Sequence, residues 1–294
     1  MLSLLASSLS APVGNSTTSQ DAVTYDKARS ARLVAFSGIA YCTGTLGKGV
    51  SNWDCAHCKD FPSVKASTFS AKGESEQNGY VAYDPNDGAD GSILVVFTGT
   101  DPLKFQQWID DIDTIAVSYP GCAGCKVHQG FYDNYKAVRS QMSTLLDSAA
   151  VEHPKSPVYI TGHSLGAAIA LHAAVEVAGG SHASRFAGMY TFGQPRVGNS
   201  AFATWAASTL GRSPHFRVTH RRDPVPHLPL EVMGFRHPER EIFYSGSSEG
   251  SYKGCDGSGE DSSCSDKYAL DVLVTDHTEY VGFDMISNYL SCKL

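Results

Sequence analysis

The sequence of 294 residues lacks three features that would assign it to other protein classes. It has no lysine- and arginine-rich run, and its 23 basic and 30 acidic residues give a net charge of −7, so nothing predicts binding to nucleic acid. It has no stretch of 18 apolar residues, which predicts no transmembrane anchor. It also has no internal repeat. With 42% hydrophobic and 18% charged residues, the chain can bury a sizeable core and is not predicted to be disordered.

The N-terminal segment 1–20 differs in composition from the rest. It has no charged side chain, an apolar stretch at Leu2–Leu9, and small polar residues after that. This pattern is typical of a signal remnant or pro-segment, although no basic residues precede the apolar stretch. We therefore predict a secreted, extracellular protein with one folded domain at 21–294. The glycosylation sequon at Asn15 agrees with secretion.

Helical and strand-like periodicities alternate along the chain. The spacing of apolar residues predicts helices over 21–41, 131–146, 165–180, 201–210 and 278–289. Apolar, β-branched runs predict strands over 78–84, 92–100, 157–162, 189–195, 215–220 and 239–246, the first two forming a hairpin. About thirty residues after Tyr41 are predicted to be loop. Strands that alternate with helices favour an α/β fold with a mostly parallel sheet covered on both faces.

The pentapeptide Gly162-His163-Ser164-Leu165-Gly166 matches G-x-S-x-G, in which a sharp strand-to-helix turn exposes a nucleophilic serine. The strand before Ser164 and the long helix after it fit this motif, and the helix N-terminus can help to bind an oxyanion. A second match, centred on Ser248, lies in a polar loop with neither element. We therefore predict Ser164 as the nucleophile and Ser248 as an ordinary loop residue.

A serine nucleophile needs an imidazole to accept its proton and a carboxylate to orient that imidazole. In this fold class the acid and then the histidine follow the serine in the chain. Asp223 comes directly after an apolar strand, at the strand end where an α/β sheet gathers catalytic groups. His277, just before the last predicted helix, is the preferred base. For the oxyanion, Leu165 offers its N–H, and Thr100 offers an N–H and a hydroxyl at the end of a buried strand.

Six other histidines follow Ser164. His172 is predicted on a helix surface. Three are predicted in polar loops: His182, His215 and His237. His220 and His227 flank Asp223 closely, and the sequence does not place them.

Several motifs, in the same order along the chain, resemble the fungal class 3 lipase family, which includes triacylglycerol lipases, mono- and diacylglycerol lipases and feruloyl esterases. They are Ala40-Tyr41-Cys42, VVFTGT, Cys122-x-x-Cys125 with Val127-His128-x-Gly130-Phe131, TGHSLGA, YTFGQPRVGN, FRVTHRRDPVPHLP and Asp276-His277. The resemblance extends from about Asp21 to the C-terminus. It implies a single α/β-hydrolase catalytic domain with a short helical lid, the triad Ser164, Asp223 and His277, and the oxyanion hole Thr100 and Leu165. It implies no metal or cofactor.

The segment 102–113 occupies the place of the family's lid, beside Thr100. As a helix it has one apolar face made of Phe105, Trp108, Ile109 and Ile112, with its aspartates mostly elsewhere. An ordinary amphipathic surface helix has the same pattern, and the position favours a lid. Exposing these four side chains costs about 6–10 kcal/mol, so we expect the face to cover the site in water and to open at a lipid surface.

The eight cysteines are predicted to form four disulfides. The two C-x-x-C pairs are too far apart for a compact zinc ribbon, and neither has the βαβ setting of a thioredoxin-like motif. Proximity suggests Cys55–Cys58 and Cys255–Cys264. The family resemblance implies Cys122–Cys125 and Cys42–Cys292.

These observations predict a secreted, monomeric ester hydrolase that cleaves acylglycerols at a lipid–water interface through an acyl-Ser164 intermediate. A feruloyl-type or other soluble-ester esterase is the alternative within the same class. That branch of the family tends to have a more polar lid segment, so the apolar face favours acylglycerols. An inactive lipid-binding protein is the alternative from another class, and the complete triad argues against it.

Overall fold

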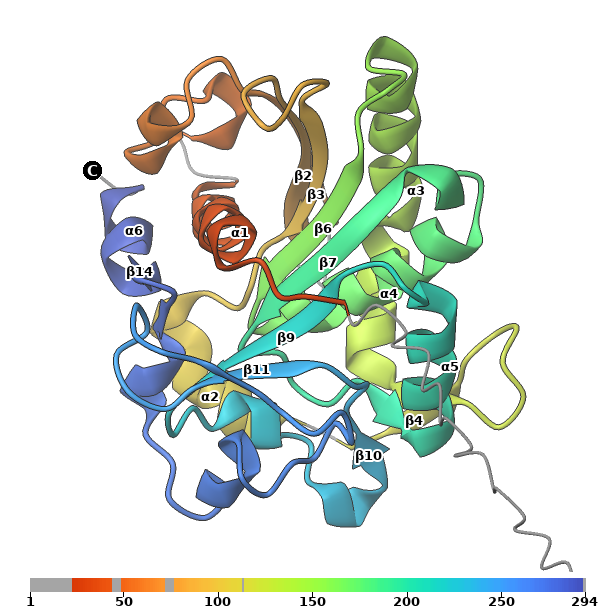
Figure 1. The fold of residues 1–294 in the computed structure, drawn as a ribbon, viewed down its shortest axis with the longest axis vertical. Helices are drawn as coiled ribbons and strands as arrows, with labels where there is room; N and C mark the ends of the chain where they lie inside the picture. Colours follow the sequence, from red (N-terminus) through yellow and green to blue (C-terminus); the bar gives the residue numbers. More distant parts are fainter. Residues whose placement is uncertain (1–22, 44–48, 72–76, 113, 293–294) are drawn as a thin grey trace, which may run out of the picture.

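A computed structural model describes residues 23–43, 49–71, 77–112 and 114–292. Eight strands form the central sheet in the order β1-β2-β3-β6-β7-β9-β11-β12 (Figure 1). Their bounds are β1 Lys65–Ser70, β2 Asn78–Asp84, β3 Ser92–Phe97, β6 Val158–His163, β7 Phe186–Phe192, β9 His215–His220, β11 Glu241–Tyr244 and β12 Lys253–Gly254. The strands from β3 to β11 are parallel, and the pairs at both edges are antiparallel.

Helices cover both faces of this sheet, as the sequence predicted. Helices α1 (Lys27–Ile39) and α6 (Met285–Ser291) lie on one face. Helices α3 (Gln129–Glu152), α4 (Leu165–Gly179) and α5 (Ser200–Leu210) lie on the other (Figure 1). Alternate residues of β3 enter different cores: Val95 packs with α3 and α4, whereas Val96 packs with α1. Because β3 is buried on both faces, its sequence after Ser92 is one continuous run of apolar residues.

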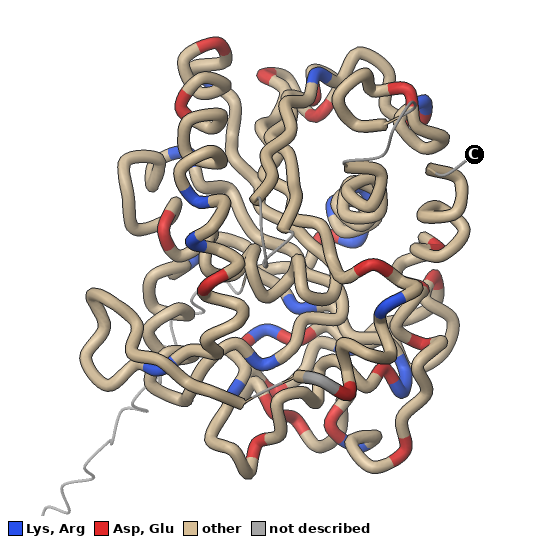
Figure 2. The backbone as a smooth tube through the Cα atoms, turned by 180° about the vertical axis from the view of Figure 1, so that it is seen from behind, with Lys and Arg blue, Asp and Glu red and all other residues tan. Residues whose placement is uncertain are grey.

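Shorter elements complete the fold. The remaining α-helix is α2 (Phe105–Asp111), and the remaining strands are β4 Ala116–Ser118, β5 Lys126–His128, β8 Gly198–Asn199, β10 Phe235–Arg236, β13 Glu279–Tyr280 and β14 Phe283–Asp284. The 3-10 helices are η1 Ala40–Cys42, η2 Val50–Asn52, η3 His57–Asp60, η4 Pro102–Lys104, η5 Ala183–Arg185, η6 Val225–His227, η7 Glu231–Met233, η8 Ser265–Tyr268 and η9 Val274–His277. Figure 2 shows basic and acidic positions interspersed along the backbone.

Two secondary-structure predictions were wrong. Strand β1 lies in the segment predicted to be loop, and Phe69 is its only buried residue, so the strand leaves no apolar periodicity. The helix predicted over 278–289 begins only at Met285, because β13 and β14 form a hairpin first. Gly282 takes a left-handed φ of 79° in that turn, and Asp284 caps α6 by accepting hydrogen bonds from two backbone N–H groups.

Four disulfides join Cys42–Cys292, Cys55–Cys58, Cys122–Cys125 and Cys255–Cys264, and no cysteine is free. This is the pairing that proximity and the family resemblance suggested. Cys42–Cys292 joins η1 to the end of α6 across a sequence separation of 250 residues. On the chain-entropy model, a loop of that length contributes up to about 5 kcal/mol to stability.

Candidate active site

Ser164 occupies the turn between the end of β6 and the start of α4. Its φ of 59° and ψ of −130° are a strained conformation for a residue with a side chain. A Cβ at Gly162 would lie 2.4 Å from the Gly166 carbonyl oxygen, and one at Gly166 would lie 2.3 Å from the Phe97 oxygen. The motif therefore requires both glycines for close backbone packing, which leaves the serine at the carboxyl end of the sheet.

His277 and Asp223 form a buried pair at the same end of the sheet. The Nδ1–H of His277 donates to Asp223 Oδ2 at 2.7 Å, and each residue is 2% exposed. The other carboxylate oxygen accepts a hydrogen bond from the Val225 N–H at 2.8 Å. Because Nδ1 carries the proton, Nε2 presents its lone pair. Within the described part of the chain, His277 Nε2 and Ser164 Oγ are both buried without a hydrogen-bond partner.

Two residues that the sequence reasoning missed also contact this pair. The Tyr280 hydroxyl donates to Asp223 Oδ2. Burial raises the pKa of Tyr280, so its hydroxyl keeps its proton. Gly193 (φ 57°) packs so closely that a Cβ there would lie 2.8 Å from His277 Cε1 and 2.9 Å from Asp223 Oδ2. Gly193 lies in the YTFGQPRVGN motif and Tyr280 lies three residues after His277, but only the fold shows that both contact the pair.

The charge of Asp223 results from opposing effects. Burial by itself raises the pKa of the carboxyl group. The charge of His277 and the hydrogen bonds from His277, Tyr280 and the Val225 N–H outweigh this effect, and the pKa is lowered from its ordinary value. Asp223 is therefore ionised near neutral pH, where it orients the imidazole and stabilises its protonated form.

The expected oxyanion donors lie at the neighbouring strand and helix ends. Thr100 follows β3, and its Oγ1 is buried with no hydrogen-bond partner among the described residues. Leu165 is the first residue of α4, whose N-terminal N–H groups point out of the helix. Thr100 and His277 line one cavity of about 230 Å³, together with Tyr41 and Phe105. An unpartnered hydroxyl donor thus faces the same space as the imidazole.

The predicted lid segment covers this site. It forms η4 and α2, so Ile112 lies just beyond the helix end. The Phe105 ring is buried and stacks on the His277 imidazole, with centroids 4.5 Å apart and planes 9° apart. Trp108 stacks in turn on Phe105 and on Phe131. Ile109 and Ile112 are half-buried, and Asp113 lies outside the described residues. The apolar side chains of the lid segment therefore separate the His277 imidazole from solvent.

Comparison with known proteins agrees with this geometry. A family model for class 3 lipases matches residues 94–233. A solved triacylglycerol lipase, described as having a catalytic centre formed by a serine protease triad, is 34% identical to this chain. The alignment has a TM-score of 0.77 and covers 88% of this chain and 95% of that one. The chain belongs to the class 3 lipase family. Its α/β-hydrolase fold is the one that the resemblance implied.

Two curated relatives of this class 3 lipase show how much of each protein is shared. A lipase of Rhizomucor miehei is 35% identical over 253 residues, which are 84% of this chain and 66% of the relative. The secreted mono- and diacylglycerol lipase A of Penicillium cyclopium is 32% identical over 194 residues, which are 66% of this chain and 60% of the relative. The chain thus spans no more than about two thirds of the curated relatives that it matches. No helix within its described residues has the length and apolarity to span a bilayer.

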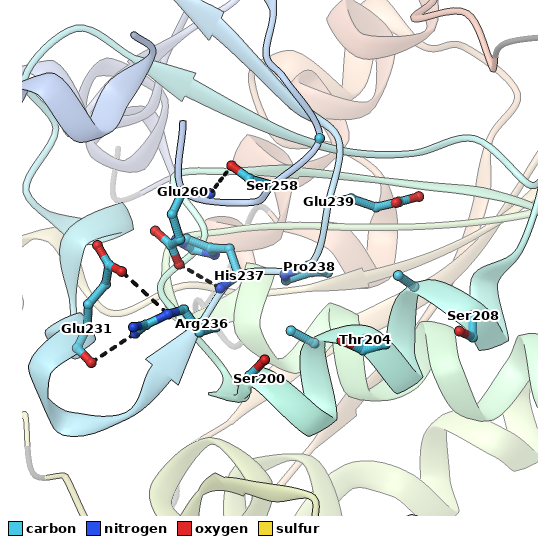
Figure 3. A pocket seen from close by; sticks show the side chains of 13 residues that line it. Ser200, Thr204, Ser208, Glu231, Arg236, His237, Pro238, Glu239, Ser258 and Glu260 are labelled. Atoms are coloured by element: carbon cyan, nitrogen blue, oxygen red, sulfur yellow. Dashed lines mark hydrogen bonds and ion pairs between the residues drawn. The ribbon is translucent and has the colours of Figure 1, made fainter. Parts of the chain in front are cut away.

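A second cavity of this class 3 lipase adjoins Leu165, the residue after Ser164. It has about 140 Å³ and is lined by Trp108, His128, Phe131, Leu165 and neighbouring residues. A larger cavity of about 610 Å³ lies elsewhere, between α5 and the loops around Glu231 and Glu260, and includes no triad residue (Figure 3). Size therefore does not identify the candidate site.

Two residues that line the larger cavity, Glu231 and Glu260, form with Asp266 a group of carboxylates, within the described part of the chain, whose oxygens lie close enough together to hold a metal ion. Arg196 lies among them, with Nη2 2.7 Å from Glu260 and 3.6 Å from each of the other two. Figure 3 also shows Arg236 paired with Glu231. Because guanidinium groups already compensate these carboxylates, we assign no metal to them.

The structure corrects two of the histidine predictions. His172 is completely buried on α4 and does not lie on a surface. His215 lies in β9 and not in a loop, whereas His237 lies in the loop after β10, as predicted, and is buried there. His172 was misplaced because α4 is apolar on all sides, which removes the polar face from which an exposed position would be recognised.

Tyr280→Phe is expected to lower kcat about tenfold, because a hydrogen bond to a charged group contributes about 1.5–3 kcal/mol. It should also make the protein less stable in acid. The lowered pKa of Asp223 contributes stability that is present above the ordinary carboxyl pKa and is lost as the pH falls through the folded-state value. Without the hydroxyl, that value rises, so Asp223 contributes less stability, the contribution is completely lost at a higher pH, and the acid-unfolding midpoint moves to a higher pH.

Acid unfolding followed by circular dichroism and initial rates on a soluble ester measure both effects. Tyr252→Phe removes an exposed hydroxyl and is the matched control. An acid-unfolding midpoint that is equal in Tyr280→Phe and wild type would contradict the contribution assigned to Tyr280.

Proposed function

We propose that this class 3 lipase hydrolyses carboxylic esters of acylglycerols through an acyl-Ser164 intermediate. The observation that carries the proposal is the buried 2.7 Å contact between His277 and Asp223, at the sheet end that bears the unpartnered Ser164 hydroxyl. Comparison supports it, because a triacylglycerol lipase with a serine protease triad is 34% identical to the chain. All the groups in the proposal belong to one domain at 21–294, which we propose acts as a monomer.

The proposed reaction has two proton-coupled halves. As Ser164 Oγ attacks the ester carbonyl carbon, His277 Nε2 accepts the hydroxyl proton. The tetrahedral oxyanion accepts hydrogen bonds from the N–H of Leu165 and from Thr100. His277 then returns the proton to the leaving alcohol oxygen, and the carbon–oxygen bond breaks. A water molecule attacks the acyl-serine in the same way, which releases the fatty acid and restores Ser164.

The contact between Phe105 and His277 supports a lid that opens at a lipid surface. With Phe105 on the imidazole and Trp108 packed behind it, an ester cannot reach the pair without movement of α2. Moving α2 exposes apolar side chains, which is unfavourable in water and favourable against acyl chains. Acylglycerol at an interface is therefore the substrate that the closed geometry favours.

Extracellular action fits the same proposal. The structure has four disulfides and no free cysteine, a pattern typical of oxidising compartments. The Penicillium relative is named a secreted lipase. We propose that this chain is secreted as well, and that segment 1–20, which lies outside the described residues, is its signal remnant or pro-segment.

Initial rates on matched mono-, di- and triacylglycerol emulsions, measured beside methyl ferulate, test the proposed substrate class. We expect acylglycerols to be hydrolysed faster than methyl ferulate. A faster rate on methyl ferulate would move the assignment to a feruloyl-type esterase. Lipid binding with no hydrolysis of any ester would overturn the proposed activity.

Trp108→Ala tests the lid. Burying a large apolar side chain contributes about 1.5–3 kcal/mol, so we expect the variant to lose about tenfold or more of its rate on emulsified ester. The rate on a soluble short-chain ester should change much less. Trp205→Ala removes the same kind of side chain from α5, away from α2, and should affect both substrates alike. Equal losses for Trp108→Ala on both substrates would rule out an interfacial role for this residue.

A further inference from the structure

The backbone that carries His277 contacts two other buried histidines. The His163 Nε2–H donates to the His277 carbonyl oxygen at 2.8 Å. The His220 Nδ1 lies 3.1 Å from the carbonyl oxygen of Asp276, the preceding residue. His163 is the neighbour of Ser164 at the end of β6, and His220 ends β9 just before Asp223. The strands that lead to Ser164 and Asp223 thus each place an imidazole against the backbone at His277 or the residue before it.

The protonation of His163 follows from its two partners. A carbonyl oxygen only accepts, so Nε2 carries the proton. Nδ1 then accepts a hydrogen bond from the Tyr41 hydroxyl at 2.7 Å. Burial, together with the nearby His277, lowers the pKa of His163 to about 3, so the ring is neutral near pH 7. Burial also raises the pKa of Tyr41, which keeps its hydroxyl a donor.

This arrangement gives His163 and His277 separate tasks, although their ring centroids are 4.4 Å apart. His163 has both nitrogens engaged and is neutral, so it does not compete for the proton that Ser164 releases. His277 has only Nδ1 engaged, by Asp223, and its Nε2 is open. The chain Tyr41 to His163 to the His277 carbonyl therefore holds the backbone of the proposed base and leaves its reactive nitrogen free.

His220 holds the same segment from the other side. Its Nε2 lies 3.0 Å from the Gly246 carbonyl oxygen, in the loop that contains the second G-x-S-x-G match. In that loop, Ser248 Oγ donates to Glu279 Oε1 at 2.5 Å and accepts from the Gly282 N–H at 3.1 Å. Ser248 therefore connects this loop to the β13–β14 hairpin after His277. Its role is structural, in agreement with the sequence prediction.

We propose that His163 and His220 are positioning residues for His277, which hold two consecutive carbonyl groups of η9 and so set the direction of the imidazole. The inference rests on the proposed ester hydrolysis. Its physical basis is that η9 is a single short turn, which by itself allows its peptide planes to rotate and the ring to swing. A displacement of about 1 Å at a reacting group is enough to cost about 100-fold in rate.

His163→Phe tests the proposal, because it keeps a ring of similar size and removes both hydrogen bonds. On a soluble short-chain ester we expect kcat to fall about 10- to 100-fold with little change in KM. His163→Gln retains an amide donor for the His277 carbonyl and should recover most of the loss. His220→Phe should likewise lower kcat with little change in KM. His182→Phe, on the surface beside Asp147, is the matched control and should keep wild-type kcat.

Two results would overturn the proposal. One is a kcat of His163→Phe within twofold of wild type. The other is a loss that His163→Gln fails to recover and that parallels a fall in thermal stability, which would mean that His163 acts only by packing.

The proposed activity is tested separately. If the wild type hydrolyses no ester, the proposed function fails, and the proton resonance of the His277 Nδ1–H still reports on positioning. That resonance should be shifted downfield by Asp223 in the wild type and lost or displaced in His163→Phe. An unchanged resonance in the variant would overturn the positioning role whatever the activity.

Discussion

Ser164→Ala is expected to lower kcat by about 10⁴- to 10⁶-fold, the range seen when a serine nucleophile is removed from a triad. Thr100 has another unpartnered hydroxyl in the cavity that His277 lines, but it does not lie at the strand-to-helix turn of a G-x-S-x-G motif. The fold should be unaffected, because Ser164 Oγ has no hydrogen-bond partner to lose and alanine tolerates the strained turn no worse than serine. The expected result is therefore an inactive protein with wild-type thermal stability.

Single-turnover rates and covalent labelling by a phosphonate ester measure this effect directly. Wild type should incorporate one phosphonyl group at Ser164, and Ser164→Ala should incorporate none. Ser208→Ala, which removes an exposed hydroxyl from α5, is the control and should label like wild type. Labelling at Ser248 would show that the wrong G-x-S-x-G match was chosen, and full labelling of Ser164→Ala would refute the assignment of the nucleophile.

The second large effect expected is a steep loss of stability as the pH falls from about 6.5 towards 3. Burial lowers the pKa of His163 and His172 to about 3 and that of His215 to about 4. Between the folded and unfolded pKa values, the unfolded chain binds more protons than the folded one, so stability decreases as the pH falls. One pKa unit corresponds to about 1.4 kcal/mol, so the three shifts together are comparable in size to the stability of a typical domain, about 5–15 kcal/mol.

His172 is the position at which this effect can be isolated. Its two ring nitrogens have no hydrogen-bond partner among the described residues, and its ring contacts Tyr119, Tyr132, Tyr135 and Phe202. His172→Phe keeps an aromatic ring in an aromatic environment and removes the group that must be protonated. We expect stability at pH 7 to be unchanged or higher, and the slope of unfolding free energy against pH to fall by up to one proton between pH 3 and 6.5.

Urea unfolding at a series of pH values measures that slope. Tyr132→Phe changes the same aromatic cluster without removing an imidazole, and it should keep the wild-type slope. If His172→Phe also keeps that slope, protonation of His172 does not contribute to the acid sensitivity. The measurement does not depend on the enzymatic assay, so it tests the packing of α3, α4 and α5 by itself.

Local patterns were sufficient for much of the fold. The continuous apolar run of β3 indicates a strand buried on both faces, because only apolar residues fit there. The glycines around Ser164 indicate close backbone packing, because no side chain fits there. Strand β1 gave no such signal, since an edge strand with one buried side chain has almost no periodic pattern. His172 was misread for the opposite reason, because a helix buried on all sides has no polar face to mark its orientation.

The sequence by itself determined the class of chemistry and the order of its groups, because a G-x-S-x-G turn between strand and helix, followed by an aspartate at a strand end and a late histidine, admits few other arrangements. Only the tertiary structure decided what surrounds those groups. Tyr41, His163, Gly193 and His220 lie within motifs that the sequence analysis quoted, and Tyr280 follows His277 closely. The sequence does not show their contacts, because those contacts join separate elements. Phe105 on the His277 ring is likewise a contact between residues far apart in sequence. Helix periodicity predicted the apolar face of the lid, and the folding of the sheet placed the imidazole beneath it.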